Sequence, residues 1–291
     1  MRYVKPDSFE TASAVLMEEQ GTVRILAGGT DVLVLLKAEV VEPDLMVDLK
    51  HLPGMCDIVE EDGGYRVGAA VCNSALGEHS GLSAMWPGVV EGAELIGSTQ
   101  VANRATMVGN LCTGSPAADA VPGLFTANAT VRVHGPDGDR DISVADIPVG
   151  PFKSSLQKGE FIKSIFLPAR PARASDAYLR FIPRTEMDIA VSAAAVSVEL
   201  DANGTITAAR VAIGAVAPTV RAVDDAAQAI VGTSLDDTAV TNLITAVEAA
   251  CAPITDKRGT IEFRTKTAGV LAKRAAKIAY SRAENNTGGQ S

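Results

Sequence analysis

Residues 23–36 read VRILAGGTDVLVLL. The apolar run at 23–26 predicts a short buried strand, and the aliphatic run at 32–36 predicts the start of a helix. Between them lies AGGTD, residues 27–31, whose two glycines leave the backbone N–H groups open to an anion. A strand, a glycine turn and a helix in this order indicate an α/β beginning and a candidate phosphate cradle, while a simple tight turn is the commoner reading of the pattern alone.

A second unusual stretch, residues 96–119, reads IGSTQVANRATMVGNLCTGSPAAD. Small and hydroxyl residues dominate it, so it is too polar and too rich in glycine for a core element. It is also longer than an ordinary connection between two elements. It is therefore either a surface loop or a segment that lines a ligand site.

The remaining pattern favours strands followed by helices. Several short strands are expected from residue 130 onward. The Pro- and Ala-rich stretch at 168–173 predicts a linker, which places a domain boundary near residue 172. Two long apolar strands, at 191–200 and 205–216, flank an Asn-Gly pair that suits a two-residue hairpin turn. Three helices are expected after them, at about 221–231, 236–250 and 260–281.

Length and composition describe a folded chain. The 291 residues are 47% hydrophobic and 21% charged, which excludes disorder as the main state and allows one large domain or two ordinary ones. No apolar run approaches the roughly 20 residues that span a bilayer, and the first residues contain no signal-like apolar stretch. We therefore expect no membrane span and a cytoplasmic location.

The net charge of −9 disfavours nucleic acid or an anionic membrane as the main partner. Charge is uneven, however, because residues 257–282 contain eight Lys and Arg residues and a single acid, Glu262. A solvated helix face explains this simply, and a docking surface for an acidic partner is the alternative.

The four cysteines, Cys56, Cys72, Cys112 and Cys251, lie far apart and form no CxxC pair. Zinc and iron–sulfur sites usually use closely spaced thiolates, so buried free thiols are expected and any metal chemistry belongs to another chain. The three histidines are equally scattered and form no metal-binding spacing.

Three ordered motifs together resemble one known family. AGGTD at 27–31, ANRATMVGNL at 102–111 and SPAADAVPGLF at 115–125 resemble, in order and spacing, the FAD-binding medium subunit of the molybdenum hydroxylases, such as xanthine dehydrogenase and carbon monoxide dehydrogenase. The resemblance continues through Glu160 to Pro168 and through the segment from Tyr178 to Ala190, so it covers essentially the whole chain.

The resemblance implies an α+β fold. Residues 1–172 would form an FAD-binding domain of the vanillyl-alcohol oxidase type (PCMH), with subdomains at about 1–55 and 56–172. Residues 173–284 would form a smaller C-terminal α+β domain, of the carbon monoxide dehydrogenase flavoprotein type, with an antiparallel sheet and helices. Residues 285–291 would be a disordered tail.

The resemblance also assigns the FAD contacts. The first turn would hold the pyrophosphate through backbone amides, and the second glycine-containing segment would form another clamp. Two residues would lie near the ribityl chain or the isoalloxazine, and three more near the ring, one of them basic. The first turn and its flanks are Leu26, Ala27, Gly28, Gly29, Thr30, Asp31 and Leu33; the second segment is Thr106, Val108, Gly109 and Asn110; the ribityl pair is Ser115 and Asp119; the ring residues are Ile162, Leu167 and Arg180.

Side-chain chemistry alone favours different roles for three of these positions. The family usually has glycine where this chain has Val108, and a β-branched residue cannot cheaply take positive φ, so either the backbone there is ordinary or the turn is altered. Asp119 precedes an apolar stretch and is equally suited to cap a helix. Arg180, like Asp188, is more simply a member of a structural ion pair or a surface charge when the resemblance is set aside.

The resemblance implies an electron-transfer oxidoreductase subunit that does not touch the organic substrate. A large partner would carry molybdopterin, a small partner would carry two [2Fe-2S] clusters, and FAD here would pass electrons to NAD, oxygen or a quinone, in a dimer of heterotrimers. Two alternatives stay open at this point. One is a self-sufficient FAD-dependent oxidase or reductase of the same fold, and the other is a scaffold that has lost FAD.

Overall fold

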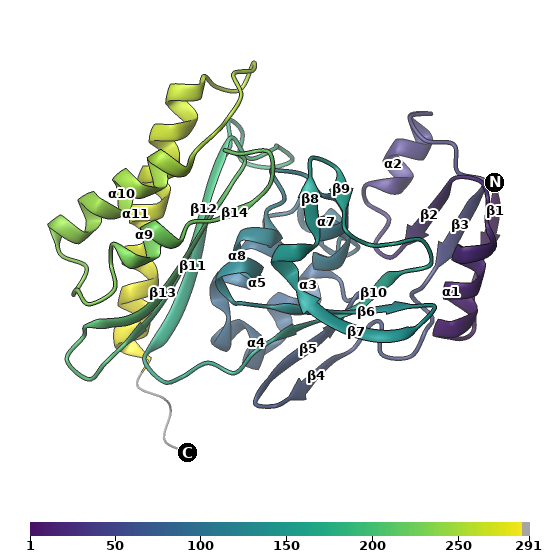
Figure 1. Cartoon of the computed structure of the whole chain (residues 1–291), viewed down its shortest axis with the longest axis horizontal. Helices are drawn as coiled ribbons and strands as arrows, with labels where there is room; N and C mark the ends of the chain where they lie inside the picture. Colours follow the sequence, from purple (N-terminus) through teal and green to yellow (C-terminus); the bar gives the residue numbers. More distant parts are fainter. Residues whose placement is uncertain (287–291) are drawn as a thin grey trace.

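The computed structural model describes residues 1–286. It opens with a small parallel sheet of order β1-β3-β2, flanked by helix α1 and by the short helix α2 (Figure 1). Ser8 caps α1, where its hydroxyl accepts the N–H of Thr11, as expected of a serine before an apolar helix. The elements are β1 (Arg2–Val4), α1 (Phe9–Glu18), β2 (Val23–Leu26), α2 (Val32–Lys37) and β3 (Leu45–Asp48).

A five-stranded antiparallel sheet of order β4-β5-β10-β6-β7 forms the middle of the molecule (Figure 1). Its central strand, β10, comes late in the sequence and inserts between β5 and β6, so the chain closes this sheet only after residue 160. The strands are β4 (Ile58–Glu61), β5 (Gly64–Gly68), β6 (Thr130–Gly135), β7 (Gly138–Ser143) and β10 (Phe161–Leu167).

Six helices lie between β5 and β6 in the sequence and pack with the middle sheet on one large apolar core. Helices α5 and α8 contact each other closely, because a Cβ atom at Gly123 would lie 3.0 Å from the Cα atom of Val89. The helices are α3 (Asn73–Glu78), α4 (Ser80–Met85), α5 (Pro87–Glu94), α6 (Thr99–Ala102), α7 (Met107–Thr113) and α8 (Ala120–Thr126). A 3-10 turn (Val144–Asp146) and a small hairpin, β8 (Pro148–Gly150) and β9 (Lys153–Ser154), follow β7.

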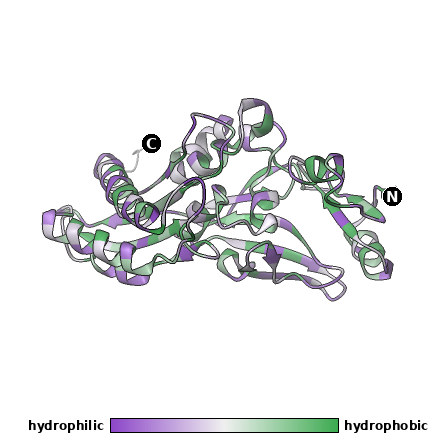
Figure 2. Cartoon of the chain, turned by 90° about the horizontal axis from the view of Figure 1, so that it is seen from above, coloured by the Kyte–Doolittle hydropathy of each residue, from purple (hydrophilic) through white to green (hydrophobic). Residues whose placement is uncertain are grey.

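A four-stranded antiparallel sheet, β11-β12-β13-β14, builds the C-terminal part. One face packs on α11 and the other on α5 and α8, and a second apolar core lies between this sheet and the C-terminal helices. Eight of the nine residues of β12 are buried, as packing on both faces of the sheet requires, and Figure 2 shows the hydropathy of each residue along the chain. The elements are β11 (Ala174–Phe181), β12 (Ser192–Leu200), β13 (Ile206–Gly214), β14 (Arg221–Ala222), α9 (Asp224–Gln228), α10 (Asp237–Ala250) and α11 (Ile261–Asn285).

The α+β class with an antiparallel C-terminal sheet is confirmed, and the local differences have simple causes. The predicted helix at 221–231 is shortened because Arg221 and Ala222 pair with β13 as an edge strand. The turn between β12 and β13 is longer than two residues because the Asp201 carboxylate accepts the N–H groups of Asn203 and Thr205. Asn285, placed in the predicted tail, is the last residue of α11, and residues 287–291 lie outside the described part.

Candidate cofactor-binding site

The AGGTD turn connects β2 to α2 as predicted. Close packing requires a glycine at position 28, and a positive φ favours one at position 29. A Cβ atom at Gly28 would overlap the carbonyl oxygen of Arg104, so the turn lies directly on the backbone of the second motif. Gly29 has φ +83°, and its Cα faces the side chains of Leu26 and Leu33. Leu33 is 46% exposed, so it is available to a ligand beside this turn.

The turn also presents unused backbone donors. Within residues 1–286, the N–H groups of Gly28, Gly29, Thr30 and Asp31 have no hydrogen-bond partner in the chain, and the Asp31 carboxylate does not cap α2. Partly exposed backbone donors with no side chain on the adjacent glycines can approach phosphate oxygens closely. The turn therefore fits the pyrophosphate of a dinucleotide cofactor.

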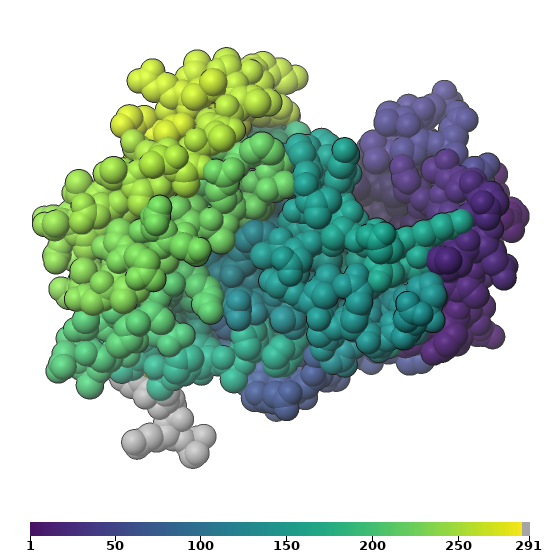
Figure 3. Space-filling model, in the orientation of Figure 1, coloured from purple at the N-terminus to yellow at the C-terminus, as the bar shows by residue number. Residues whose placement is uncertain are grey.

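Thr113 and Gly114, which follow the second motif, connect the first turn to neighbouring elements. The Thr113 hydroxyl donates to the Asp31 carboxylate at 2.8 Å, which joins the end of α7 to the start of α2. Gly114 contacts the small hairpin, because its carbonyl oxygen accepts the N–H of Phe152 at 2.9 Å. In the space-filling view, a hollow separates the α2 region from the rest of the molecule (Figure 3).

Residues 106–110 use most of their polar groups within the chain. The Thr106 hydroxyl caps α7 by accepting the N–H of Gly109 at 2.9 Å, and the Asn110 side-chain oxygen accepts the N–H of Ala120 at 3.0 Å. Val108 lies inside α7 and is buried in the main core, without a positive φ, so the ordinary backbone predicted for a β-branched residue is confirmed. Contact of this segment with FAD stays a prediction.

Asp119 does not cap α8, and that alternative is wrong. Its carboxylate makes no capping hydrogen bond, because it points instead toward β11. One carboxylate oxygen accepts the Tyr178 hydroxyl at 2.6 Å, and the other accepts Nη1 of Arg180. The N–H groups that a cap at Asp119 would accept are not available, because Val121 donates to the Ala118 carbonyl oxygen and Pro122 has no N–H.

Asp119 and Arg180 form a buried ion pair, with side chains 9% and 5% exposed. Burial raises the pKa of the Asp119 carboxyl, while Arg180 and the Tyr178 hydroxyl oppose that rise. Burial and the neighbouring carboxylate also raise the pKa of Tyr178 well above its ordinary value, so Tyr178 is a neutral donor. The ion pair expected as the simpler role of Arg180 is therefore present, as is the one between Asp188 and Arg184.

The remaining predicted residues are not all brought to the turn. Ile162 and Leu167, on β10, are buried in the main core, which leaves no side chain of either open to a ligand. The Ser115 hydroxyl accepts the N–H of Ala117 in a local turn. Sequence reasoning missed Thr113 and Tyr178, whose roles depend on partners 82 and 59 residues away.

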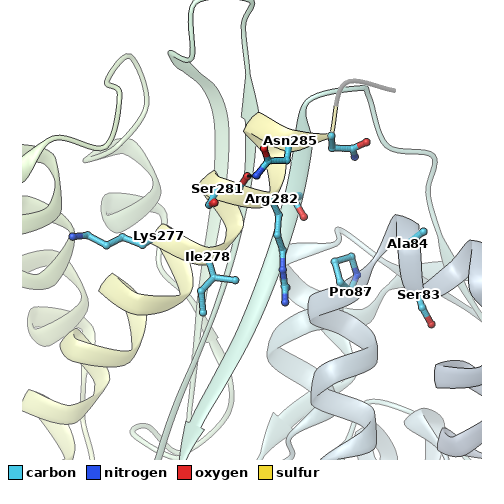
Figure 4. A pocket seen from close by; sticks show the side chains of 10 residues that line it. Ser83, Ala84, Pro87, Lys277, Ile278, Ser281, Arg282 and Asn285 are labelled. Carbon is cyan, nitrogen blue, oxygen red and sulfur yellow. Dashed lines mark hydrogen bonds between the residues drawn. The ribbon is translucent and has the colours of Figure 1, made fainter. Parts of the chain in front are cut away.

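A large cavity lies elsewhere in the molecule. About 640 Å³ opens between the last turns of α11, the start of α5 and β11, and Figure 4 shows Lys277 pointing away from it. Arg282 extends toward α5, donates to the Asp176 carbonyl oxygen and pairs with Glu91. Arg282 thus connects α11 to β11 and α5 beside this cavity.

No group of three His, Cys, Asp or Glu side chains that could hold a metal ion occurs in residues 1–286. Burial raises the pKa of the Cys112 thiol to about 12 and that of Cys251 to about 11, so neither is a thiolate near neutral pH. In the same part of the chain, no helix combines the length and apolar character that a membrane crossing demands.

Comparison with known families agrees with this geometry. The model of the FAD binding domain in molybdopterin dehydrogenase matches residues 1–170, which include the turn, the second motif and the whole middle sheet. The chain belongs to this family. The model of the CO dehydrogenase flavoprotein C-terminal domain matches residues 177–279.

Individual relatives cover almost the whole chain. The carbon monoxide dehydrogenase medium chain of Afipia carboxidovorans is 31% identical over 97% of this chain and 98% of its own length. A xanthine dehydrogenase FAD-binding subunit of Escherichia coli is 29% identical over 92% of each. The structure of reconstituted CO dehydrogenase from Oligotropha carboxidovorans contains a chain that superposes with a TM-score of 0.92, at 31% identity and with 97% and 98% coverage. The chain is therefore an FAD-binding member of an oxidoreductase family.

Proposed function

We propose that this chain is the FAD-carrying electron-transfer subunit of a heteromeric molybdenum hydroxylase. It would accept electrons from [2Fe-2S] clusters on a small partner and pass them to a final acceptor, with molybdopterin and the organic substrate on a large partner. The row of unused N–H groups at residues 28–31 is the observation that carries this proposal. The family membership of residues 1–170 supports it.

The chain's own residues have distinct tasks in this proposal. Backbone donors from Gly28 to Asp31 bind the pyrophosphate, and Leu26 and Leu33 supply apolar walls beside it. The second motif holds the turn in place where Gly28 lies against Arg104, and Thr113, just after this motif, adds its hydrogen bond to Asp31. FAD, when bound, supplies redox chemistry that side chains of this chain cannot supply.

Arg180 acts near the flavin part of the site in this proposal. Because Asp119 pairs with Arg180, the pair carries no net charge, so Arg180 contributes through the direction of its donors more than through long-range attraction.

The domain division proposed for this subunit is 1–172 and 173–284, and the proposed location is the cytoplasm.

The proposed assembly is a dimer of heterotrimers. Of the eight basic residues at 257–282, four pair with acids inside the chain: Arg258, Arg264, Lys266 and Arg282. Lys273, Arg274 and Lys277 form no ion pair within residues 1–286 and leave a basic stripe on the outer side of α11. We assign this stripe to an acidic surface of the iron–sulfur partner.

Charge reversal tests the stripe. The double variant Lys273→Glu, Arg274→Glu should reduce recovery of the small partner in affinity purification. The reduction should be larger at low salt, because charges are screened less there. The matched control is Lys158→Glu, a reversal at an exposed lysine on a loop of the middle region. If the double variant assembles as the unaltered chain does, the basic stripe is not part of the interface with the small partner.

The visible absorption spectrum of the tagged chain, purified gently from its host with its companions, tests the function. A two-peaked flavin spectrum above a broad iron–sulfur background, with two companion chains, is expected. A lone chain with FAD that turns over a small organic substrate would replace the proposal with a self-sufficient oxidoreductase. A companion-bound but flavin-free chain that also fails to bind added FAD would instead indicate a scaffold.

A further inference from the structure

The small hairpin carries the most exposed aromatic residue of the chain. Two residues, Pro151 and Phe152, connect β8 to β9. Phe152 is 71% exposed, more than any other Phe, Tyr or Trp. A single exposed apolar side chain is common on protein surfaces, so exposure alone does not mark a site. The backbone of Phe152 supplies the second observation.

Phe152 has a backbone conformation that large side chains avoid. Its φ is +58°, in the left-handed region that glycine and asparagine favour. When proline occupies the first position of a two-residue turn, a positive φ at the second position usually requires glycine. A phenylalanine there is strained and is not stabilised by burial. Strained residues of this kind cluster at ligand sites, where binding offsets the strain.

Contacts within the chain place Phe152 close to the first turn. The Gly114 carbonyl oxygen accepts the Phe152 N–H at 2.9 Å, and a Cβ atom at Gly114 would lie 3.2 Å from the Phe152 Cα atom. The preceding residue, Thr113, donates its hydroxyl to the Asp31 carboxylate at 2.8 Å. Two short contacts therefore join Phe152 to the turn that carries the unused N–H groups.

The hairpin also borders the hollow beside α2. Figures 1 and 3 show β8 and β9 on the side of the hollow that faces α2. On the α2 side, Leu33 is 46% exposed and Val34 is 63% exposed. FAD has its pyrophosphate in the middle and an aromatic ring at each end, so a cofactor held at the turn extends a ring to either side of it. Phe152 is accessible to such a ring.

We propose that Phe152 binds FAD by stacking on one of its two aromatic rings. The inference rests on the proposed function, since FAD has to bind to this chain. The adenine and the isoalloxazine both present a flat aromatic face, which is the chemistry that a phenylalanine ring recognises. Stacking needs a flat side chain at this position, so tyrosine can replace Phe152, whereas leucine cannot.

The test compares Phe152→Leu and Phe152→Tyr with the unaltered protein, each purified as the assembled complex and freed of FAD. Rebinding is followed by quenching of flavin fluorescence. In Phe152→Leu the dissociation constant for FAD should rise about tenfold, the effect of losing one base stacked on an aromatic side chain. Phe152→Tyr should bind FAD as the unaltered protein does. Weaker binding of ADP in Phe152→Leu would assign the stacked ring to adenine, and weaker binding of FMN would assign it to the isoalloxazine.

Phe152→Gly separates binding from folding. Glycine takes a positive φ without strain, so the urea midpoint of the FAD-free variant should stay unchanged or rise. The dissociation constant for FAD should nevertheless rise at least as much as in Phe152→Leu. A lower urea midpoint together with unchanged FAD affinity would show that the ring stabilises the fold, and would overturn the inference.

Phe166→Leu is the matched control. Phe166 is half-buried on β10 and lies against the Arg66 guanidinium, so its loss should leave FAD affinity unchanged. Unaltered protein that fails to bind FAD would overturn the proposed function. Tight FAD binding that is the same in Phe152→Leu and in the unaltered protein would overturn only this inference, also if recovery of a partner chain falls in that variant.

Discussion

Gly28 of the first motif lies in direct backbone contact with Arg104 of the second, so that any side chain at position 28 would overlap the Arg104 carbonyl oxygen. The two motifs lie far apart in the sequence and nevertheless meet without a side chain between them. The backbone of the second motif therefore lies directly against the turn that carries the N–H donors of residues 28–31.

Gly28→Ala should therefore abolish tight FAD binding, because backbone atoms cannot move aside as a flexible side chain can. FAD titration monitored by flavin fluorescence measures this. Gly150→Ala is the matched control, since a Cβ atom there would meet only the end of Lys153 at 3.8 Å and its φ is ordinary. Equal FAD affinity in the two variants would show that the contact does not shape the site.

Asp119 is expected to matter for stability through its ion pair. Asp119→Ala leaves the Arg180 guanidinium buried without its partner, which should lower the free energy of unfolding by about 3–5 kcal/mol. The double variant Asp119→Ala with Arg180→Met should recover part of that loss, because no charge is then buried. Urea unfolding of these two variants and of Arg180→Met alone provides the double-mutant cycle. Additive losses in the two single variants would show that the pair is not coupled.

The first turn was predictable because its signals are local. An apolar run, two glycines and an aliphatic run at 23–36 give the strand, turn and helix without reference to the rest of the chain. The family motifs then identify the fold. The helices α6 and α7 inside residues 96–119 were missed because small and hydroxyl residues hide helical periodicity, although Ser98 and Thr106 are typical N-caps.

The cluster of Asp119, Tyr178 and Arg180 was only partly predictable. The resemblance named two of its members, but residue spacing cannot show that a carboxylate turns away from its own helix toward a strand 59 residues later. The local signal, an aspartate before an apolar run, favours a cap. Here Val121 donates its N–H to the Ala118 carbonyl oxygen, Pro122 has no N–H, and the Asp119 carboxylate pairs with Arg180.

Val108 offers a test of the departure from the family motif. Because it is buried in α7, Val108→Gly removes an apolar side chain from the core and introduces a flexible residue into a helix. The free energy of unfolding should fall by about 2–4 kcal/mol, with no gain in FAD affinity. Chemical denaturation and FAD titration measure the two effects. Tighter FAD binding in this variant would show that the family glycine makes a cofactor contact that valine prevents.

The free energy of unfolding should fall in acid because of two partly exposed ion pairs at the middle sheet. The Arg66 guanidinium holds the pKa of Glu61 below its ordinary value of 4.5, and Arg140 does the same for Glu160. A carboxyl whose pKa is lower in the folded state contributes stability above its unfolded pKa and loses it as the pH falls through the folded pKa. The free energy of unfolding should therefore decrease as the pH falls below about 4.5.

The variant Glu61→Gln isolates one of these contributions. Its free energy of unfolding should be lower than that of the unaltered chain at neutral pH, and the difference should shrink as the pH falls, because glutamine does not titrate. Partial exposure of the pair limits the neutral-pH difference to roughly 1 kcal/mol or less. The measurement is a series of urea unfolding curves from pH 7 to about pH 3. A difference that stays constant over this range would mean that Glu61 stabilises the sheet by packing and hydrogen bonding rather than by its charge.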